Sequence, residues 1–299
     1  MHASALSVVV PHYGHPAPTR ALLVALAAQE ECPSLQVVVV DDASPTPFPD
    51  VEGAHVVRRE TNGGFGSAVN SGVEVAEHPL LLVLNSDLEF GPRFVADLLA
   101  AGAPWLPAVV SPRVVDRDGH QAWTGRHFPS ARQQAVEWLT PLVRLRDRPR
   151  LHEAVGHDTR AVDATAVVDW VVGAALLLPT AEFRAVGGFD ERFFMNSEEI
   201  DLQRRLRDRG LRSVALTSPV VVHEGGGSSD PEGRRRWLVT SRLAYADKWG
   251  GRRRLQAALT GATVVNLAWN GGRRLAGRRV HPIRTAHDEL GLLFGRLGP

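Results

Sequence analysis

The segment LLLVLNSD, residues 80–87, places five consecutive apolar residues directly before three polar ones. An apolar run without alternation is typical of a strand whose two faces are both buried, as in a parallel sheet covered by helices. Residues 6–10 and 35–40 form similar runs, and the segments 19–30 and 66–76 carry apolar residues at helical spacing. This succession predicts an α/β fold with a mixed, mostly parallel sheet and helices on both faces.

Polar side chains follow three of the predicted strands, namely His12 and Tyr13, Asp41 and Asp42, and Asn85, Ser86 and Asp87. In parallel sheets ligands bind at the carboxyl ends of the strands, so these side chains are candidate site residues. Asn85 and Asp87 can face one pocket, and hard divalent cations prefer such oxygen ligands. A carboxylate such as Asp41 can accept a hydrogen bond from a base or a ribose hydroxyl. A plain loop turn after residue 84, and a helix N-cap or Asx-turn at Asp41, are the alternative interpretations.

A glycine-rich segment, Asn62-Gly63-Gly64-Phe65-Gly66, precedes the helix predicted at 66–76. Glycines let a backbone approach a phosphate or a ribose closely. The dinucleotide fingerprint G-x-G-x-x-G is not met, because Val69 stands where the third glycine belongs. The segment therefore does not indicate a nicotinamide enzyme.

Three carboxylates fall within one turn at the start of a helix predicted over residues 197–209, namely Glu198, Glu199 and Asp201. Ser197 is the predicted N-cap, and Gly210 follows the end of the helix. Stabilisation of the helix through its dipole is the simplest interpretation of these acids. Clustered acids also repel one another, and a site that keeps them together usually has a cation or uses a raised pKa. His223, at the end of an apolar run, is a candidate metal ligand or diphosphate hydrogen-bond donor, or else an ordinary core or surface histidine.

Charge is unevenly distributed along the chain, although the net charge of the 299 residues is only +1. Residues 1–230 carry 20 basic and 29 acidic side chains, whereas residues 231–299 carry 14 basic and 4 acidic ones. We therefore expect one domain over 1–230 and a basic, helical extension over 231–299. The extension favours contact with an anionic membrane surface, with a solvated tail as the alternative. The acidic body argues against nucleic acid as a partner.

No apolar run reaches the length of a membrane span, and no signal peptide is visible, so we expect a cytoplasmic location. The longest apolar stretch, residues 255–269, is bracketed by arginines. We expect it either to dock peripherally on the inner face of a membrane or to pack on the catalytic domain or a second subunit. The single cysteine, Cys32, excludes an internal disulfide.

The ordered motifs of the chain resemble the family 2 glycosyltransferases with the GT-A fold, and most of all the bacterial rhamnosyltransferase and galactofuranosyltransferase enzymes. The resemblance covers residues 6–229 and is carried, in chain order, by VVVPHYG, VVVVDDASP, NGGFGSAVNSG, LLLVLNSD, VVGAALLLP, VGGFDERFFMNSEEIDLQRRL and VVVHEGGGSS. It implies an inverting hexosyltransferase that moves a sugar from a nucleoside-diphosphate sugar, with dTDP-rhamnose as the first expectation, to a glycan or lipid-linked acceptor. A homodimer is a further expectation. A nucleotidyltransferase on a similar sheet and a non-catalytic nucleotide-sugar-binding module are the alternatives.

The resemblance also implies roles for individual residues. The implied ligands of a divalent metal, Mg²⁺ or Mn²⁺, are Asn85, Asp87 and His223. The implied catalytic residues are Glu199 as general base and Glu198 and Asp201 as groups that orient the base or the acceptor. The residues implied to bind the nucleotide or the sugar are Pro11, His12, Tyr13, Asp41, Asp42, Asn62, Gly63, Gly64, Asn70, Ser86, Gly173 and Asp190. Two positions depart from the family pattern, since Asn85 is a neutral ligand and Glu199 adds one methylene to the usual aspartate.

Overall fold

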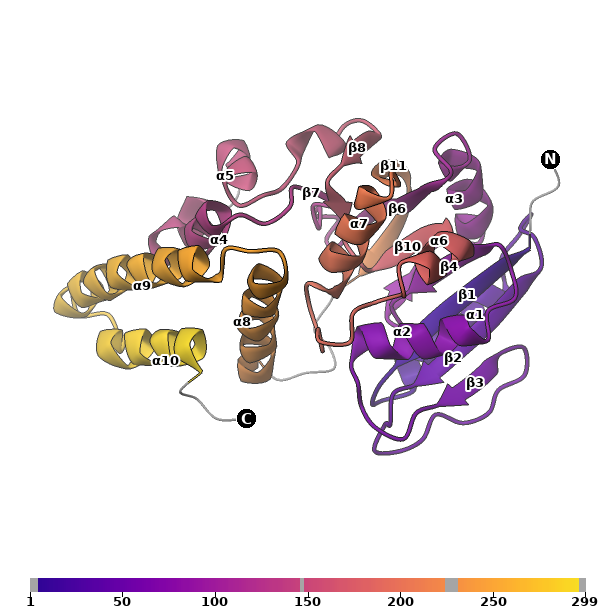
Figure 1. Ribbon diagram of the computed structural model, residues 1–299, viewed down its shortest axis with the longest axis horizontal. Coiled ribbons are helices and arrows are strands. Elements are labelled where there is room, and N and C mark those ends of the chain that lie inside the picture. Colours follow the sequence, from indigo (N-terminus) through magenta and orange to yellow (C-terminus); the bar gives the residue numbers. More distant parts are fainter. Residues whose placement is uncertain (1–4, 146–147, 224–230, 296–299) are drawn as a thin grey trace. The chain divides into compact units, whose positions relative to one another are not determined.

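The structure is a computed structural model that describes residues 5–145, 148–223 and 231–295 (Figure 1). The chain forms two compact units, the first of residues 1–126 and 160–230 and the second of residues 127–159 and 231–299. The segment 127–159, which we predicted as part of the first domain, thus belongs with the C-terminal helices. The reason is that a helix in this segment packs on a helix of the C-terminal part, a long-range contact that no local pattern announces.

A nine-stranded sheet forms the centre of the first unit, in the order β3-β2-β1-β4-β10-β6-β11-β5 with β8 paired to β11. The strands are β1 (Leu6–His12), β2 (Leu35–Asp41), β3 (His55–Arg58), β4 (Leu80–Leu84), β5 (Leu88–Glu89), β6 (Ala108–Val115), β8 (Ala166–Val168), β10 (Ala175–Pro179) and β11 (Arg212–His223). β7 (Gly125–Arg126) and β9 (Trp170–Val171) form a separate two-stranded sheet. Most paired positions are parallel, and β10 runs antiparallel between β4 and β6. The predicted mixed, mostly parallel sheet is confirmed.

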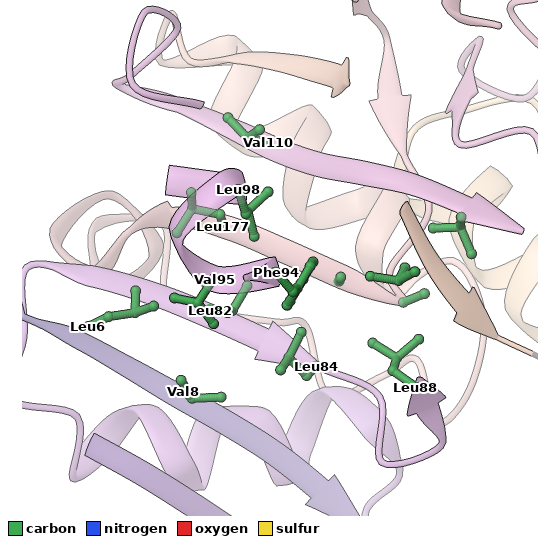
Figure 2. Close-up of a cluster of buried hydrophobic side chains, with 14 of the residues drawn as sticks. Leu6, Val8, Leu82, Leu84, Leu88, Phe94, Val95, Leu98, Val110 and Leu177 are labelled. Atoms are coloured by element: carbon green, nitrogen blue, oxygen red, sulfur yellow. The ribbon is translucent and has the colours of Figure 1, made fainter. Parts of the chain in front are cut away.

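Helices cover both faces of this sheet, as predicted (Figure 1). They are α1 (Ala17–Ala27) and α3 (Phe94–Gly102) on one face, and α2 (Phe65–Glu74), α6 (Thr180–Ala185) and α7 (Glu198–Asp208) on the other. Alternate strand residues face the two sides, so Leu82 lies in the first core and Leu81 in the second. Figure 2 shows Phe94 and Leu98 of α3 among the strand side chains of the first core. Both faces are therefore dry, which is why the strands are apolar throughout.

Strand register brings the predicted site residues to one edge of the sheet. His12 lies opposite Asp41 in the parallel pair of β1 and β2. β4 is parallel to β1, so its carboxyl end, which leads into residue 85, points the same way. β11 runs antiparallel to β5 and pairs His223 with Leu88, directly after the polar turn. These pairings join positions that are far apart in the sequence.

The second unit is helical in its described part. It contains α4 (Ala131–Trp138), the 3-10 helix η1 (Thr140–Leu145), α5 (Pro149–Ala154), α8 (Pro231–Lys248), α9 (Arg252–Leu275) and α10 (Pro282–Phe294), and the 3-10 turn η2 (Thr159–Ala161) lies at the unit boundary. The described part of the segment 128–160 thus contributes two α-helices and two 3-10 segments. α4 begins at a capping box in which Ser130 and Gln133 bind each other's backbone, a local signal that the sequence carries. No helix in the described ranges is long and apolar enough to cross a bilayer.

Candidate active site

Asn85, Asp87 and His223 meet at the polar turn between β4 and β5. His223 Nε2 lies 3.1 Å from Asn85 Nδ2 and 3.3 Å from Asp87 Oδ1. Burial by itself would raise the pKa of Asp87, but the hydrogen bond and positive charge of His223 outweigh it and hold that pKa below its usual value. The carboxyl group of Asp87 is therefore ionised at neutral pH.

The chemistry of this donor set fits a hard divalent cation. Asn85 Oδ1 is buried and has no hydrogen-bond partner among the described residues. A buried carbonyl oxygen without a partner is costly, and a cation would satisfy it. A carboxylate oxygen from Asp87 and an imidazole nitrogen from His223 complete a set of the kind that Mg²⁺ or Mn²⁺ accepts. The glycine-rich stretch at 225–229 in the sequence motif after His223 lies outside the described residues.

A second acid motif, Asp116 and Asp118, occupies an exposed turn directly after β6. Gly119 has a φ of +82°, as a tight turn requires, and Val115 pairs with Gln121 across the turn. His120 lies 3.2 Å from Asp116 Oδ2. We therefore assign no role in the site to this motif.

Asp41 and Asp42 order the loops around the site. Asp41 is buried, and its two oxygens accept the backbone N–H groups of Ser44 (3.0 Å) and Phe48 (2.8 Å). Burial by itself would raise the pKa of Asp41, but these hydrogen bonds outweigh it and leave the pKa low. Asp42 accepts the N–H groups of Gly63 and Gly64 at 3.1 and 2.8 Å. Both carboxylates therefore have structural partners, and any nucleotide contact would be additional to these.

His12 is a buried histidine beside Asp41. Its Nδ1 lies 2.7 Å from Thr19 Oγ1, and its ring packs against Phe48 with centroids 4.7 Å apart. Burial lowers the pKa of His12, so the ring is neutral at pH 7. Nε2 is buried without a partner in the described part of the chain, which leaves one ring nitrogen able to bind a ligand. Of its neighbours in the sequence, Pro11 is half-buried and Tyr13 is exposed.

The glycine-rich segment brings two loops together. Gly64 has a φ of +83°, and a Cβ there would lie 1.8 Å from the carbonyl oxygen of Phe194. Asn70 of α2 holds the same loop, because its amide binds both the N–H (2.8 Å) and the C=O (2.9 Å) of Phe189. These residues therefore fix the loop that leads into α7, and Asn62 is exposed beside them.

Glu198, which is buried, and Glu199, which is half-buried, form an acid pair at the start of α7. Each has an Oε2 atom that is buried without a hydrogen-bond partner in the described ranges. The pKa of Glu198 is raised well above its usual value by burial and by the negative charge of Glu199. Burial also raises the pKa of Glu199, although backbone N–H groups and Arg126 oppose the rise. Both carboxyl groups therefore hold a proton more tightly than exposed carboxyls do.

The backbone before the acid pair is unusual. Asn196 and Ser197 have φ values of +70° and +69°, in the left-handed region that costs about 1 kcal/mol or more for residues other than glycine. Ser197 is the N-cap residue of α7, as predicted, but its side chain makes no cap hydrogen bond. An N-cap residue whose side chain accepts a helix N–H usually has an extended backbone, which Ser197 does not have.

Two residues that sequence reasoning missed, Gln203 and Arg126, act on Glu199. The buried side chain of Gln203 accepts the N–H of Val171 (2.8 Å) and donates to the C=O of Val171 (2.7 Å) and of Glu199 (3.1 Å). Arg126 supplies the positive charge that acts on Glu199. No local pattern marks Gln203 or Arg126, because both meet their partners only in the folded chain.

Gly173 connects the acid pair to the polar turn. A Cβ at Gly173 would lie 3.3 Å from Glu199 Cβ and 3.4 Å from Glu199 Cγ. The next residue, Ala174, accepts a hydrogen bond of 2.9 Å from the backbone N–H of Asn85. The short turn before β10 thus lies between Glu199 and the cluster of Asn85, Asp87 and His223.

Other sequence candidates have partners of their own. Asp201 is fully buried and forms an ion pair of 2.8 Å with Arg205, which leaves it no access to a substrate. Asp190 binds Arg192 at 2.6 Å. Ser86 is half-buried within the polar turn. The structure therefore gives Asp201 and Asp190 positions that stabilise α7 and the loop before it.

The family of the chain follows from comparison with known proteins. Residues 7–159 match the model of glycosyl transferase family 2. The chain belongs to this family. It is 29% identical over 253 residues to the N-acetylglucosaminyl-diphospho-decaprenol L-rhamnosyltransferase of Mycobacterium tuberculosis, which covers 75% of this chain and 77% of that one. It is 32% identical over 230 residues to the validoxylamine A glucosyltransferase of Streptomyces hygroscopicus subsp. limoneus, covering 70% of this chain and 49% of that one.

Among solved structures, the fold is similar to that of the mannosyltransferase PcManGT from Pyrobaculum calidifontis in complex with GDP-Man and Mn²⁺. The TM-score is 0.57 at 18% identity, over 98% of this chain and 86% of that one. This family 2 glycosyltransferase therefore has the GT-A fold and is an enzyme related to rhamnosyltransferases, as the sequence motifs predicted.

Proposed function

We propose that this family 2 glycosyltransferase transfers a sugar from a nucleoside-diphosphate sugar to an acceptor hydroxyl with inversion at the anomeric carbon. The observation that carries the proposal is the convergence of two groups on one turn. A Cβ at Gly173 would lie 3.3 Å from Glu199 Cβ, and Ala174 accepts the N–H of Asn85. The side chain of Asn85 contacts His223, which in turn contacts Asp87. The proposed base and the proposed metal cluster thus adjoin the same short segment. This arrangement suits a single displacement at the anomeric carbon, in which the acceptor hydroxyl is deprotonated while the diphosphate departs.

Asp87, His223 and the unpartnered oxygen of Asn85 would hold a divalent metal, Mg²⁺ or Mn²⁺. When bound, the metal supplies neutralisation of the charge on the departing diphosphate. Two observations support a metal at this place. The donor set suits a divalent cation, and the similar structure of PcManGT contains Mn²⁺. The neutral ring of His12 has a free Nε2 that would bind the nucleotide.

Glu199 is the proposed general base. It takes the proton of the acceptor hydroxyl while that oxygen forms a bond to the anomeric carbon and the bond to the diphosphate oxygen breaks. We propose that Glu198 stays protonated and that Glu199 is ionised, because burial and the charge of Glu199 raise the pKa of Glu198, whereas Arg126 and backbone N–H groups oppose the rise at Glu199. A raised pKa also makes Glu199 a stronger base than an exposed carboxylate.

For the substrates we propose a deoxyhexose donor of the dTDP-rhamnose type and a glycan or polyprenyl-diphosphate-linked acceptor. The support is the similarity to a rhamnosyltransferase whose name specifies an N-acetylglucosaminyl-diphospho-decaprenol acceptor.

We also propose peripheral contact of the second unit with the inner face of a membrane. Leu255 and Leu259 are buried among α8 and α10, so half of the apolar stretch packs within the unit. Val264 and Leu275 of α9 are 60% and 92% exposed, and they lie about three helical turns apart on one face. An exposed apolar face on a basic helical unit is typical of interfacial helices.

A thermal-shift series tests the catalytic proposal. Nucleoside diphosphates and their sugars, each with and without Mn²⁺, should raise the Tm of the protein by binding its native state. The cognate pair should do so only with metal, and Asp87→Ala should remove the metal dependence. Sugar transfer with the donor so identified then tests turnover. If no nucleotide raises the Tm, or Asp87→Ala keeps the full metal-dependent shift, the site is wrongly assigned.

A further inference from the structure

The second unit contains a cavity of about 680 Å³ at its surface. α4, η1, α8, α9 and α10, with the residues just before α10, contribute its lining. Five arginines line it, namely Arg235, Arg242, Arg273, Arg279 and Arg284. The catalytic proposal uses none of them. The guanidinium group presents several N–H donors in a plane, which matches the oxygens of a phosphate.

Not all of this positive charge is neutralised within the protein. Arg235 binds Glu289 at 2.9 Å, and Arg242 binds Glu137. Arg284 is only loosely paired, 3.9 Å from Asp288. Among the residues that the structure describes, Arg273 and Arg279 form no ion pair, and the side chain of Arg273 donates to the neutral amide of Asn270. The cavity therefore has positive charge available to an anionic ligand.

The wall of the cavity is built rigidly. Glu289 is only 3% exposed, and its Oε2 accepts from Thr263 Oγ1 (2.8 Å) and Trp138 Nε1 (3.2 Å). Arg235 also lies over the Trp138 ring, 5.1 Å from its centroid. These contacts fix Arg235 before a ligand arrives, which lowers the entropy cost of binding.

The start of α10 adds a second feature that suits an anion. This 13-residue helix has no side-chain N-cap hydrogen bond and no acidic residue in its first turn. His281, its N-cap residue, and Arg284 in its first turn both line the cavity. No side chain of α10 therefore caps the N–H groups at the positive end of its helix dipole.

Apolar side chains border the same cavity. Val143 lines it and is 45% exposed, and Ile283, beside the lining residues of α10, is 80% exposed. A site for a free phosphate in water needs no such border. A lipid with a phosphate headgroup needs both features, arginines for the headgroup and apolar contacts for the chain.

We propose that this cavity binds the diphosphate of a polyprenyl-linked sugar, that is, the headgroup of the lipid acceptor. The inference rests on the proposed function only for the acceptor class. A diphosphate diester carries one negative charge on each phosphorus, which Arg273 and Arg279 match. The diphosphate of the sugar donor belongs to the site in the first unit, so the two anions have separate places.

Vesicle binding of the full chain tests this proposal. The probe is neutral phosphatidylcholine vesicles with a small fraction of a polyprenyl-diphosphate-linked N-acetylglucosamine. The matched comparison is phosphatidylglycerol vesicles of the same total charge. Arg273→Gln/Arg279→Gln should weaken binding to the first vesicles about tenfold or more, since each basic group near an anionic surface contributes severalfold. The control Arg253→Gln/Arg254→Gln removes the same charge from exposed positions outside the cavity and should change binding much less.

Three results would overturn the proposal. Equal loss in both double variants, or equal affinity for the two vesicle types, would mean nonspecific attraction to charge. Saturable binding of inorganic pyrophosphate without any binding to the polyprenyl vesicles would mean a site for free phosphate only. Circular dichroism and the donor-induced Tm shift check folding of the variants. That shift also separates the two proposals, because it reports the first unit and should stay unchanged in Arg273→Gln/Arg279→Gln.

Discussion

Replacement of Gly173 by alanine should reduce turnover by displacing the proposed base. The new Cβ would lie 3.3 and 3.4 Å from two carbons of Glu199, whereas carbon atoms in contact are usually about 3.5–4.0 Å apart. Gln203 holds the backbone at Glu199, so the side chain must move by a few tenths of an ångström. A misplacement of about 1 Å costs roughly 10²-fold in rate, so we expect a fall in kcat of about tenfold.

Steady-state kinetics with saturating donor measure this effect. The KM for the donor should change little, because the nucleotide side of the site is untouched. Gly91→Ala is the matched control, since a Cβ there meets nothing within 4 Å, and it should leave kcat unchanged.

A double-mutant cycle decides whether Gly173 acts through Glu199. In a Glu199→Gln background, Gly173→Ala should cause little further loss, because the base is already gone. Additive losses, or an unchanged kcat in Gly173→Ala, would refute the argument that this glycine makes room for Glu199.

The remaining predictions concern the acid pair, the metal cluster and the exposed face of α9. Glu199→Gln should lower kcat by about 10²-fold or more and leave donor binding intact. A larger loss of kcat in Glu198→Gln would mean that Glu198 is the general base. The pKa of Glu198 is raised in the folded state, so the unfolded chain releases this proton at a lower pH than the folded chain does. The free energy of unfolding therefore falls as pH rises from about 4 toward the folded-state pKa. Glu198→Gln should therefore raise the Tm at pH 7 but not at pH 4, and scans at both values check this. Asn85→Asp should maintain or increase Mn²⁺ affinity by calorimetry, and weaker binding would count against a metal at this turn. Val264→Glu should reduce co-sedimentation of the protein with anionic vesicles, and added salt should release the unmodified protein from these vesicles. If the unmodified protein binds neither anionic nor neutral vesicles, docking on a membrane is excluded.

Local sequence patterns were sufficient to predict the class of the sheet and three of its strands, β1, β2 and β4. An unbroken apolar run such as residues 80–84 is typical of a strand covered on both faces, and β4 is such a strand. The polar residues after each run lie at strand ends for the same reason. The meeting of Asp87 with His223 needed the pairing of β5 with β11, which only the resemblance to a family suggested.

Long-range contacts limited what the sequence could tell about the rest. The roles of Gln203 and Arg126 depend on partners that no spacing rule identifies. Ser197 has the residue type of an N-cap, but the tertiary structure holds its backbone in the left-handed region and overrides that preference. The glycine-rich segment was interpreted as a phosphate contact, and its glycines at 64 and 66 also allow close approach to the loop before α7.

The second unit consists of two segments that are separated in the sequence by residues 160–230 of the first unit, and this separation affects the timing of folding during synthesis. Residues 127–159 leave the ribosome early, but α9, on which α4 packs, is made only after the rest of the first unit. At roughly 5–20 residues per second, this interval is on the order of ten seconds. During this interval Trp138 lacks its hydrogen-bond partners Thr263 and Glu289, because they have not yet been synthesised. A nascent chain of this enzyme therefore exposes an unfinished helical segment that chaperones can bind, and deleting residues 231–299 would make that exposure permanent.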